Sequence, residues 1–406
     1  MQEEKVILVG LQTEEETDHF TYSMEELARL VGTAGGEVVG TFTQKRSAID
    51  PRTFVGKGKI QEISHAVDET QAQTVVFNQA LSPRQVRNIQ DIIDAKIIDR
   101  MQLILDIFAM RANSREGRLQ VELAQQEYLL PRLVGQGTNL SRLGGGIGTR
   151  GPGETQLESD RRYIQGRITD IKNELKKVSA HRERNRQRRQ DKQVFQIGLV
   201  GYTNAGKSTL LNALTQAETF EEDTLFATLD PLTRKYDLGT GMEVTLTDTV
   251  GFIQDLPTEL VAAFQSTLEE TRNMDLLLHV IDASAAYIEI QEETVVELLE
   301  DMDSHDIPGL AVYNKADLAK SDFVPQLYPH IIISAKNEED IDHLHEAIRE
   351  QIKEILVPYR RVLPGDEASD LAQMQKESLV TQWTFNDETN EYTVEGYAKA
   401  SSKWVN

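Results

Sequence analysis

Hydrophobic and polar positions up to about residue 110 follow two alternating periods. Short β-branched runs, typical of buried strands, alternate with segments whose apolar residues recur every three or four positions, as in helices. The predicted strands are Val6–Val9, Gly36–Thr43, Thr74–Phe77 and Lys96–Ile98, and the predicted helices include Ser23–Leu30, Ile60–Asp68 and Pro83–Ile93. Strands alternating with helices are typical of a mostly parallel sheet, so an N-terminal α/β domain is predicted over residues 1–112.

A helical pattern follows in residues 113–192. One helix is predicted over 117–131, and a second carries apolar residues at spacings of 4, 3, 4 and 3. These seam residues are Ile164, Ile168, Ile171, Leu175 and Val178. Such a seam packs against a partner helix. We therefore expect a helical hairpin of the coiled-coil type, with a Gly-rich loop at 135–153 that holds eight glycines in nineteen positions.

The alternating pattern returns in residues 193–358 and predicts a second α/β domain. Its strands are predicted at Val194–Val200, Val244–Asp248, Leu276–Ile281, Leu310–Tyr313 and His330–Ile333. A small C-terminal α+β module is predicted over 366–406, where Gln382–Phe385 and Tyr392–Tyr397 are strand-like. The fold class is therefore α/β, with four parts in chain order.

Composition excludes several kinds of chemistry. The 406 residues include no cysteine, which excludes disulfides, Cys-ligated zinc or iron–sulfur sites and a Cys nucleophile. Met1 to Glu4 lack the basic and apolar regions of a signal peptide, and no stretch reaches the roughly 18 apolar residues of a membrane span. We expect a cytoplasmic protein without a membrane span.

The net charge of −23 argues, as an average, against a polyanionic partner. Residues 161–192, however, contain twelve Lys or Arg and four acids, a net charge of +8, which leaves −31 for the rest. The basic residues crowd the end of this helix at Arg182, Arg184, Arg186, Arg188 and Arg189. A solvated helix face is the simpler interpretation, but such segregation favours a basic arm that binds RNA. Arg142 and Arg150 lie in the Gly-rich loop, where the backbone can approach RNA closely.

The motif G-x-x-x-x-G-K-S stands between a predicted strand and a predicted helix, as a phosphate-binding loop requires. Its residues, with the first one after it, are Gly201, Tyr202, Thr203, Asn204, Ala205, Gly206, Lys207, Ser208 and Thr209. The glycines let successive backbone N–H groups surround phosphate oxygens, and the helix N-terminus adds a partial positive charge. Lys207 is predicted to reach the β- and γ-phosphates, and Ser208 to offer its hydroxyl to Mg²⁺.

A second motif, N-K-x-D, follows the strand Leu310–Tyr313 and supplies Asn314, Lys315 and Asp317. Carboxyl ends of parallel strands are where open α/β sheets bind ligands. The Asp317 carboxylate can accept hydrogens from guanine N1 and the 2-amino group, a pattern that adenine lacks. Ser334, Ala335 and Lys336 follow the next strand and are predicted to close the other side of the base.

With Asp248, Thr249, Val250 and Gly251 between them, these motifs resemble the signature set of the translation-factor-like GTPases. The resemblance implies that Gly251 touches the γ-phosphate and that loops 219–233 and 252–260 order around it. It makes Thr228 the switch threonine, with Thr224 and Thr233 as alternatives. The implied metal ligands are Ser208, Thr228 and Asp248, and the implied catalytic groups are Lys207, Thr228 and Gly251.

Phe252 stands where many signalling GTPases carry a water-orienting glutamine. Its ring cannot hydrogen-bond water, so we expect slow intrinsic turnover that a partner raises. Asn204 stands where some potassium-activated GTPases hold the ion, which makes K⁺ a candidate cofactor beside Mg²⁺.

Longer segments resemble the HflX family, and the resemblance covers nearly the whole chain. They are Phe54–Lys59, Leu143–Glu158, Phe226–Asp230 and Asp248–Thr267. The resemblance implies that Phe226 and Ala227 lie at the nucleotide. The family implies a Mg²⁺-dependent GTPase, here expected to be monomeric, that binds GTP and GDP. It also implies binding to the large ribosomal subunit and its ribosomal RNA through the hairpin, and splitting or rescue of stalled or inactive ribosomes.

Two other functions stay open. The chain could be a nucleotide-gated scaffold that binds a protein partner through the helical seam. An ATP-dependent RNA-remodelling activity, also associated with the family, is disfavoured because Asp317 selects guanine and no second G-x-x-x-x-G-K-[ST] motif is present.

Overall fold

The computed structural model describes residues 3–13, 16–133, 152–191, 193–215, 225–254, 271–321, 323–366 and 368–405. For 152–157, 179–183, 185–191 and 368 it describes the backbone alone. Two compact units make up the chain, one mainly of residues 1–178 and the other mainly of 179–406. The Gly-rich loop, up to residue 151 and including Arg142 and Arg150, lies outside the described residues.

The first unit is built on a four-stranded sheet of order β2-β1-β3-β4, parallel throughout, as predicted. Its strands are β1 (Glu4–Gln12), β2 (Gly36–Lys45), β3 (Thr74–Phe77) and β4 (Lys96–Asp99). Its helices are α1 (Thr17–Thr33), α2 (Lys57–Thr70), α3 (Pro83–Gln90) and α4 (Arg100–Arg111), of which α4 had not been predicted. Alternate residues of β1, among them Ile7 and Val9, pack with Ile60 and Ile63 of α2, because successive strand residues face opposite sides of a sheet.

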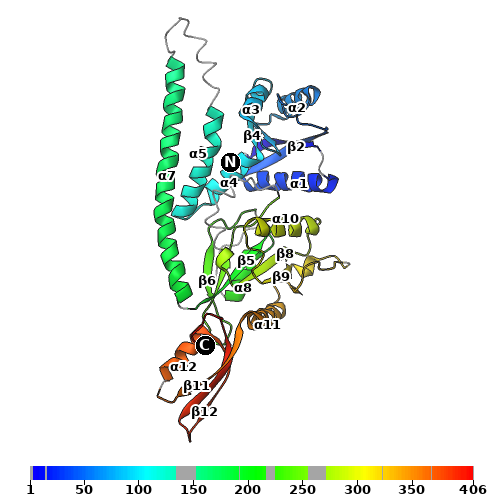
Figure 1. Ribbon diagram of the computed structural model, residues 1–406. Helices are drawn as coiled ribbons and strands as arrows, with labels where there is room; N and C mark the ends of the chain where they lie inside the picture. Colours follow the sequence, from blue (N-terminus) through cyan, green and yellow to red (C-terminus); the bar gives the residue numbers. More distant parts are fainter. Residues whose placement is uncertain are drawn as a thin grey trace. The chain divides into compact units, whose positions relative to one another are not determined.

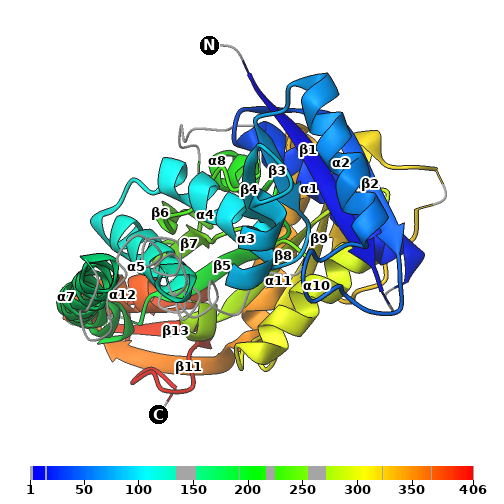
Figure 2. The same cartoon turned by 90° about the horizontal axis from the view of Figure 1, so that it is seen from above.

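Two antiparallel helices follow, α5 (Arg115–Leu133) and α7 (Pro152–Asp191), which lie side by side in Figures 1 and 2. Leu119 and Leu123 of α5 form a cluster with Ile168, Ile171 and Leu175 of α7. The middle of the predicted seam is therefore an interhelical contact. Within the described ranges neither α7 nor any other helix is long and apolar enough to cross a membrane.

A buried carboxylate joins α5 to the sheet. Asp99, at the end of β4 and 1% exposed, accepts hydrogen bonds from the Leu81 N–H (3.0 Å) and the Gln102 N–H (3.0 Å). From α5 it accepts the Tyr128 hydroxyl (2.8 Å) and the Arg132 guanidinium (3.1 Å). Burial raises the pKa of Tyr128, so its hydroxyl stays a donor. This network holds the C-terminal end of α5 against the α/β domain.

The second unit contains a six-stranded sheet of order β10-β9-β8-β5-β7-β6. Its strands are β5 (Phe195–Gly201), β6 (Leu232–Tyr236), β7 (Val244–Asp248), β8 (Leu276–Asp282), β9 (Gly309–Asn314) and β10 (His330–Ile332). Five of them were predicted, whereas the antiparallel edge strand β6 was not. Along β8, Leu276, Leu278 and Val280 enter the core that includes α8 (Lys207–Thr215) and α11 (Glu338–Ile355).

A three-stranded antiparallel sheet of order β11-β13-β12 completes this unit. Its elements are β11 (Val357–Pro364), α12 (Ala368–Glu377), β12 (Leu379–Asn386) and β13 (Glu391–Ala398), and β11 had no counterpart among the predicted strands. Leu379 reaches into the core of the larger sheet. The Lys399 ammonium binds the Asp275 carboxylate at 2.7 Å, so the small sheet is tied to the larger one by both apolar and ionic contacts.

The Asp99 network generates a stability prediction. We expect Asp99→Asn to lower the local unfolding free energy around β4 and α5 by roughly 2–3 kcal/mol, because the amide leaves the Arg132 guanidinium without its carboxylate. Hydrogen exchange of the α5 amides in the full chain measures this change. The exposed Asp94→Asn is the matched control and should leave exchange unchanged. Unaltered α5 protection in Asp99→Asn would contradict the proposed linkage.

Candidate nucleotide site

The loop between β5 and α8 has room only for glycine at two positions. Gly201 has φ +150°, and a Cβ there would lie 2.2 Å from the Val280 carbonyl oxygen of β8. Gly206 has φ +96°, and a Cβ there would lie 2.3 Å from Asn314 Nδ2. Both close approaches hold the loop against neighbouring strands directly before the N-terminus of α8, the place where a phosphate-binding loop stands.

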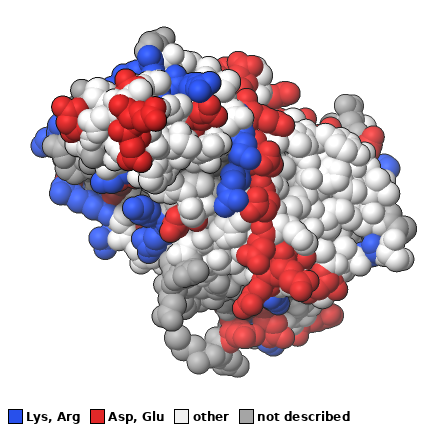
Figure 3. Space-filling view, turned by 90° about the horizontal axis from the view of Figure 1, so that it is seen from below, with Lys and Arg blue, Asp and Glu red and all other residues white. Residues whose placement is uncertain are grey.

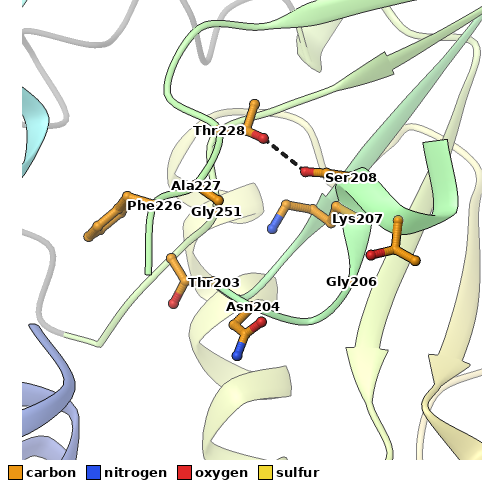
Figure 4. Close-up of a pocket in the computed structure, with 10 residues that line it drawn as sticks. Thr203, Asn204, Gly206, Lys207, Ser208, Phe226, Ala227, Thr228 and Gly251 are labelled. Carbon is orange, nitrogen blue, oxygen red and sulfur yellow. Dashed lines mark hydrogen bonds between the residues drawn. The ribbon is translucent and has the colours of Figure 1, made fainter. Parts of the chain in front are cut away.

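A cavity opens at this loop, and ten residues line it (Figure 4). They are Thr203, Asn204, Gly206, Lys207, Ser208, Thr209, Phe226, Ala227, Thr228 and Gly251. Every one belongs to the predicted nucleotide-binding set, and they come from three separate segments of the chain. The structure thus brings the phosphate loop, the Phe226–Thr228 segment and Gly251 to one place.

Lys207 is buried, and its ammonium donates to the carbonyl oxygens of Gly201 (3.1 Å) and Tyr202 (2.8 Å). A Cβ at Gly251 would lie 3.0 Å from Lys207 Nζ, so the lysine extends to the loop after β7. Burial lowers the pKa of Lys207 to about 8. Phosphate oxygens would compete with the two carbonyls for the ammonium and favour its charged form.

Ser208, Thr228 and Asp248 form an oxygen cluster beside the lysine. The Ser208 hydroxyl donates to Asp248 Oδ2 at 2.7 Å and lies 2.8 Å from the Thr228 hydroxyl (dashed in Figure 4). Asp248 Oδ1 is buried without a hydrogen-bond partner among the described residues, and burial raises the pKa of this carboxyl. Hard oxygen donors of this kind, together with phosphate, are the ligands that Mg²⁺ takes, so the residues fit this ion.

The alternatives to Thr228 are placed elsewhere. Thr233 lies on β6, where its hydroxyl is 3.0 Å from the Thr247 hydroxyl. Thr224 lies outside the described residues, as do residues 219–223 and 255–260 of the two predicted switch loops. Among the described residues, Thr228 is therefore the switch candidate whose hydroxyl meets Ser208.

On the base side, Asn314 connects three loops. Its Nδ2 donates to the Ala205 carbonyl oxygen at 3.0 Å, and its Oδ1 accepts the Ala335 N–H at 2.9 Å. Lys315 donates to the Asn204 carbonyl oxygen at 2.9 Å and to Asp282 Oδ2 at 2.8 Å. These contacts hold the predicted base-recognition residues against the phosphate loop.

The remaining base-side residues lie at the strand ends but do not line the cavity described above. Asp317 is exposed on a short 3₁₀ turn, Ala316–Leu318, where its carboxylate is accessible to a ligand. Ser334 is buried and its N–H donates to Asp340 Oδ2 at 2.8 Å, whereas Lys336 is exposed.

Two supporting carboxylates, Asp282 and Asp340, were not among the predicted site residues. Asp282 ends β8 and Asp340 lies in the first turn of α11. The position of Asp282 at a strand end, next to the ends of β5 and β9, was the signal in the sequence that could have pointed to it. Their role is to hold Lys315 and Ser334, so neither belongs to a ligand motif.

The loop after β7 is packed against the rest of the domain and is mostly buried. The Thr249 hydroxyl donates to the Leu199 carbonyl oxygen at 2.7 Å, and Val250 is buried. The Phe252 ring is 1% exposed, and the Phe252 N–H donates to the Gly201 carbonyl oxygen at 3.1 Å. Phe252 therefore anchors the loop, in keeping with its inability to position a water molecule.

A phosphate-binding loop at the start of a helix, an Asp-Thr-Val-Gly segment and an Asn-Lys-x-Asp motif at a strand end together define a P-loop GTPase domain. Residues 196–315 match the family model described as 50S ribosome-binding GTPase. Residues 21–109 match GTP-binding GTPase N-terminal, and residues 111–189 match GTP-binding GTPase Middle Region.

Close relatives cover nearly the whole chain. It is 53% identical over 396 residues to GTPase HflX of Alkalihalophilus pseudofirmus, with 97% of this chain and 94% of that protein covered. It is 51% identical over 365 residues to GTPase HflX of Caldanaerobacter subterraneus subsp. tengcongensis, with 88% and 84% covered. For GTPase HflX of Escherichia coli the identity is 44% over 392 residues, with 95% and 91% covered. The chain belongs to the HflX family of GTPases, as its sequence motifs indicated.

Base selection by Asp317 can be tested directly. We expect Asp317→Asn to weaken GTP binding at least about a hundredfold and to strengthen xanthosine triphosphate binding, because the amide can donate to the 2-oxo group of xanthine. Equilibrium titration with GTP and with xanthosine triphosphate measures the two dissociation constants and so the change in base preference. The exposed Asp342→Asn on α11 is the control. Unchanged GTP affinity in Asp317→Asn would show that another residue selects the base.

Proposed function

We propose that this protein hydrolyses GTP with Mg²⁺ in the cytoplasm and that its nucleotide state controls binding to the large ribosomal subunit, where it splits or rescues stalled or inactive ribosomes. The observation that carries the proposal is membership of the HflX family over nearly the full length, together with a GTPase domain model described as ribosome-binding. The oxygen cluster and the phosphate loop support the chemical part.

In the proposed reaction, loop N–H groups and Lys207 hold the phosphates, and the lysine exchanges its two carbonyl partners for phosphate oxygens. Ser208, Thr228 and Asp248 would hold Mg²⁺, which neutralises charge on the phosphates when bound. The Gly251 backbone lies next to Lys207 Nζ and would meet the γ-phosphate. The Phe252 ring cannot orient a water molecule, so intrinsic GTP hydrolysis is slow and the ribosome raises its rate.

The hairpin carries the proposed RNA contact, although part of its positive charge is already neutralised. On α7, Arg167 makes a bidentate pair with Glu122 of α5 at 2.7 and 2.9 Å, and Lys172 pairs with Glu127 at 2.8 Å. The net charge of +8 counted along residues 161–192 therefore overstates the charge available to phosphate.

The exposed basic residues of α7 with no ion pair in the described part of the chain are Arg161, Lys176 and Lys177. Arg184 is also exposed, whereas the side chains of Arg182, Arg186, Arg188 and Arg189 lie outside the described residues. Figure 3 shows groups of acidic side chains on one face, with Lys and Arg side chains beside them. Because neighbouring acids repel phosphate, a contact with a polyanion would be directed to particular basic side chains.

Ribosome binding should be salt-sensitive and depend on α7. We expect the triple variant Arg161→Glu, Lys176→Glu and Lys177→Glu to weaken co-sedimentation of the GTP-analogue-bound protein with large subunits at least about tenfold. The slope of log affinity against log salt should fall by roughly two units for the three lost phosphate contacts.

The control changes the same charge on exposed residues outside the hairpin, namely Lys235→Glu, Lys320→Glu and Lys403→Glu. It should retain binding. Failure of the GTP-loaded wild-type chain to co-sediment at low salt would refute ribosome binding. Equal loss in both triple variants would refute the assignment to α7, and binding only to a nuclease-resistant protein partner would favour the scaffold function.

Asn204 supports a further part of the proposal, that K⁺ joins Mg²⁺ at this site. Its side chain lines the cavity, and φ of +61° turns its backbone into the left-handed region at the mouth of the loop. We expect GTP hydrolysis to be faster in KCl than in NaCl at equal ionic strength, and Asn204→Ala to abolish the difference. Equal wild-type rates in the two salts would exclude K⁺ activation.

A further inference from the structure

A second cavity lies in the GTPase domain near the amino ends of β8 and β9, apart from the nucleotide site. Its volume is about 460 Å³, within the range of pockets that hold small organic ligands. Leu277 of β8, Leu299 of α10 (Ile288–Asp301) and Leu327 contribute apolar wall. The cavity is therefore a predominantly apolar chamber within one unit of the protein.

Two polar side chains, His279 and Ser304, lie deep in this wall, and the Ser304 hydroxyl donates to the Met302 carbonyl oxygen at 3.3 Å. The neighbours of His279 along β8, Leu278 and Val280, face the core under α8 and α11, so His279 faces the opposite side of the sheet. The His279 side chain lines the cavity, is only 8% exposed and has no hydrogen-bond partner among the described residues. The ring nitrogens are not among the fully buried unpaired atoms of the described residues, so they are accessible from the cavity. A polar ring that no described protein group engages can hydrogen-bond a ligand there.

The state of the imidazole defines the chemistry of that ligand. Burial, together with the nearby charge of Lys207, lowers the pKa of His279 to about 4, so the ring is neutral at pH 7. A neutral imidazole offers one N–H donor and one acceptor nitrogen. A hydroxyl group pairs with either nitrogen, whereas an ionised group would lose its hydration against the apolar wall.

The mouth of the cavity also disfavours anions. Glu300 of α10 is exposed at its rim, as are His305 and Tyr328, whose ring is 76% exposed. Glu300 supplies a negative charge close to any entering molecule. An apolar wall, a neutral hydrogen-bonding ring and an acidic rim together select a neutral molecule.

We propose that this cavity is a binding site for a small neutral amphipathic molecule, with a flat or aliphatic apolar body and one hydroxyl group bound to His279. The apolar body fills the space between α10 and the strands. The hydroxyl supplies the hydrogen bond that the buried imidazole lacks.

The probe is 2-naphthol, compared with naphthalene, which has the same rings without the hydroxyl. Titration of the full chain in saturating GDP keeps both molecules out of the nucleotide site. We expect 2-naphthol to bind about fivefold more tightly than naphthalene, the gain of one hydrogen bond. His279→Phe should abolish this preference, and its matched control, exposed His343→Phe on α11, should retain it.

A second variant does not depend on the stability of His279→Phe. Gly309 lies in the cavity wall, and a Cβ there would meet only the Leu277 carbonyl oxygen at 3.9 Å. Gly309→Leu should therefore fold and obstruct the cavity, weakening 2-naphthol binding at least about tenfold while GDP affinity stays unchanged. Absence of 2-naphthol binding to the wild type, equal affinity for both probes, or unaltered binding to Gly309→Leu would each overturn the proposal.

Discussion

The nucleotide site depends on the two ends of one buried amide. Asn314 donates from Nδ2 to the phosphate loop at the Ala205 carbonyl oxygen and accepts at Oδ1 from the Ala335 N–H. Because both ends are used in a buried position, the ends of β5, β9 and β10 are held at one spacing. The lack of a Cβ at Gly206 lets that amide approach the loop. The residues predicted to recognise phosphate and base therefore share one support.

Charged side chains hold elements together in the first unit as well, but the ion pairs leave fewer basic groups free to bind a polyanion. The buried Asp99 carboxylate at the end of β4 gathers donors from the loop after β3, from α4 and from the C-terminal end of α5, and so orients α5. Earlier in α5, Glu122 and Glu127 pair with basic residues of α7. These exposed or half-exposed pairs add little stability. Their larger effect is to restrict which basic side chains of α7 remain available to a polyanion.

The sequence alone predicted the elements whose signals are local. The parallel strands of both α/β sheets and the seam residues Ile168, Ile171 and Leu175 follow from periodicity, which backbone geometry dictates within a few residues. Ser82 followed by Pro83 predicted the start of α3, and the Ser82 hydroxyl accepts the Gln85 N–H there. Six of the ten residues that line the cavity at the phosphate loop belong to that loop or directly follow it, and its residue types and spacing are fixed by phosphate binding. The other four, Phe226, Ala227, Thr228 and Gly251, were expected from the family resemblance.

Contacts between distant segments were decided only by the tertiary structure. The edge strands β6 and β11 exist because they pair with β7 and β13, and short edge strands carry little signal of their own. Asp282 and Asp340 acquire their roles by meeting Lys315 and Ser334 across the fold. The same holds for His279, which interrupts an apolar strand in the sequence but faces a cavity in the structure. Periodicity assigns a residue to a face, whereas packing alone decides what that face meets.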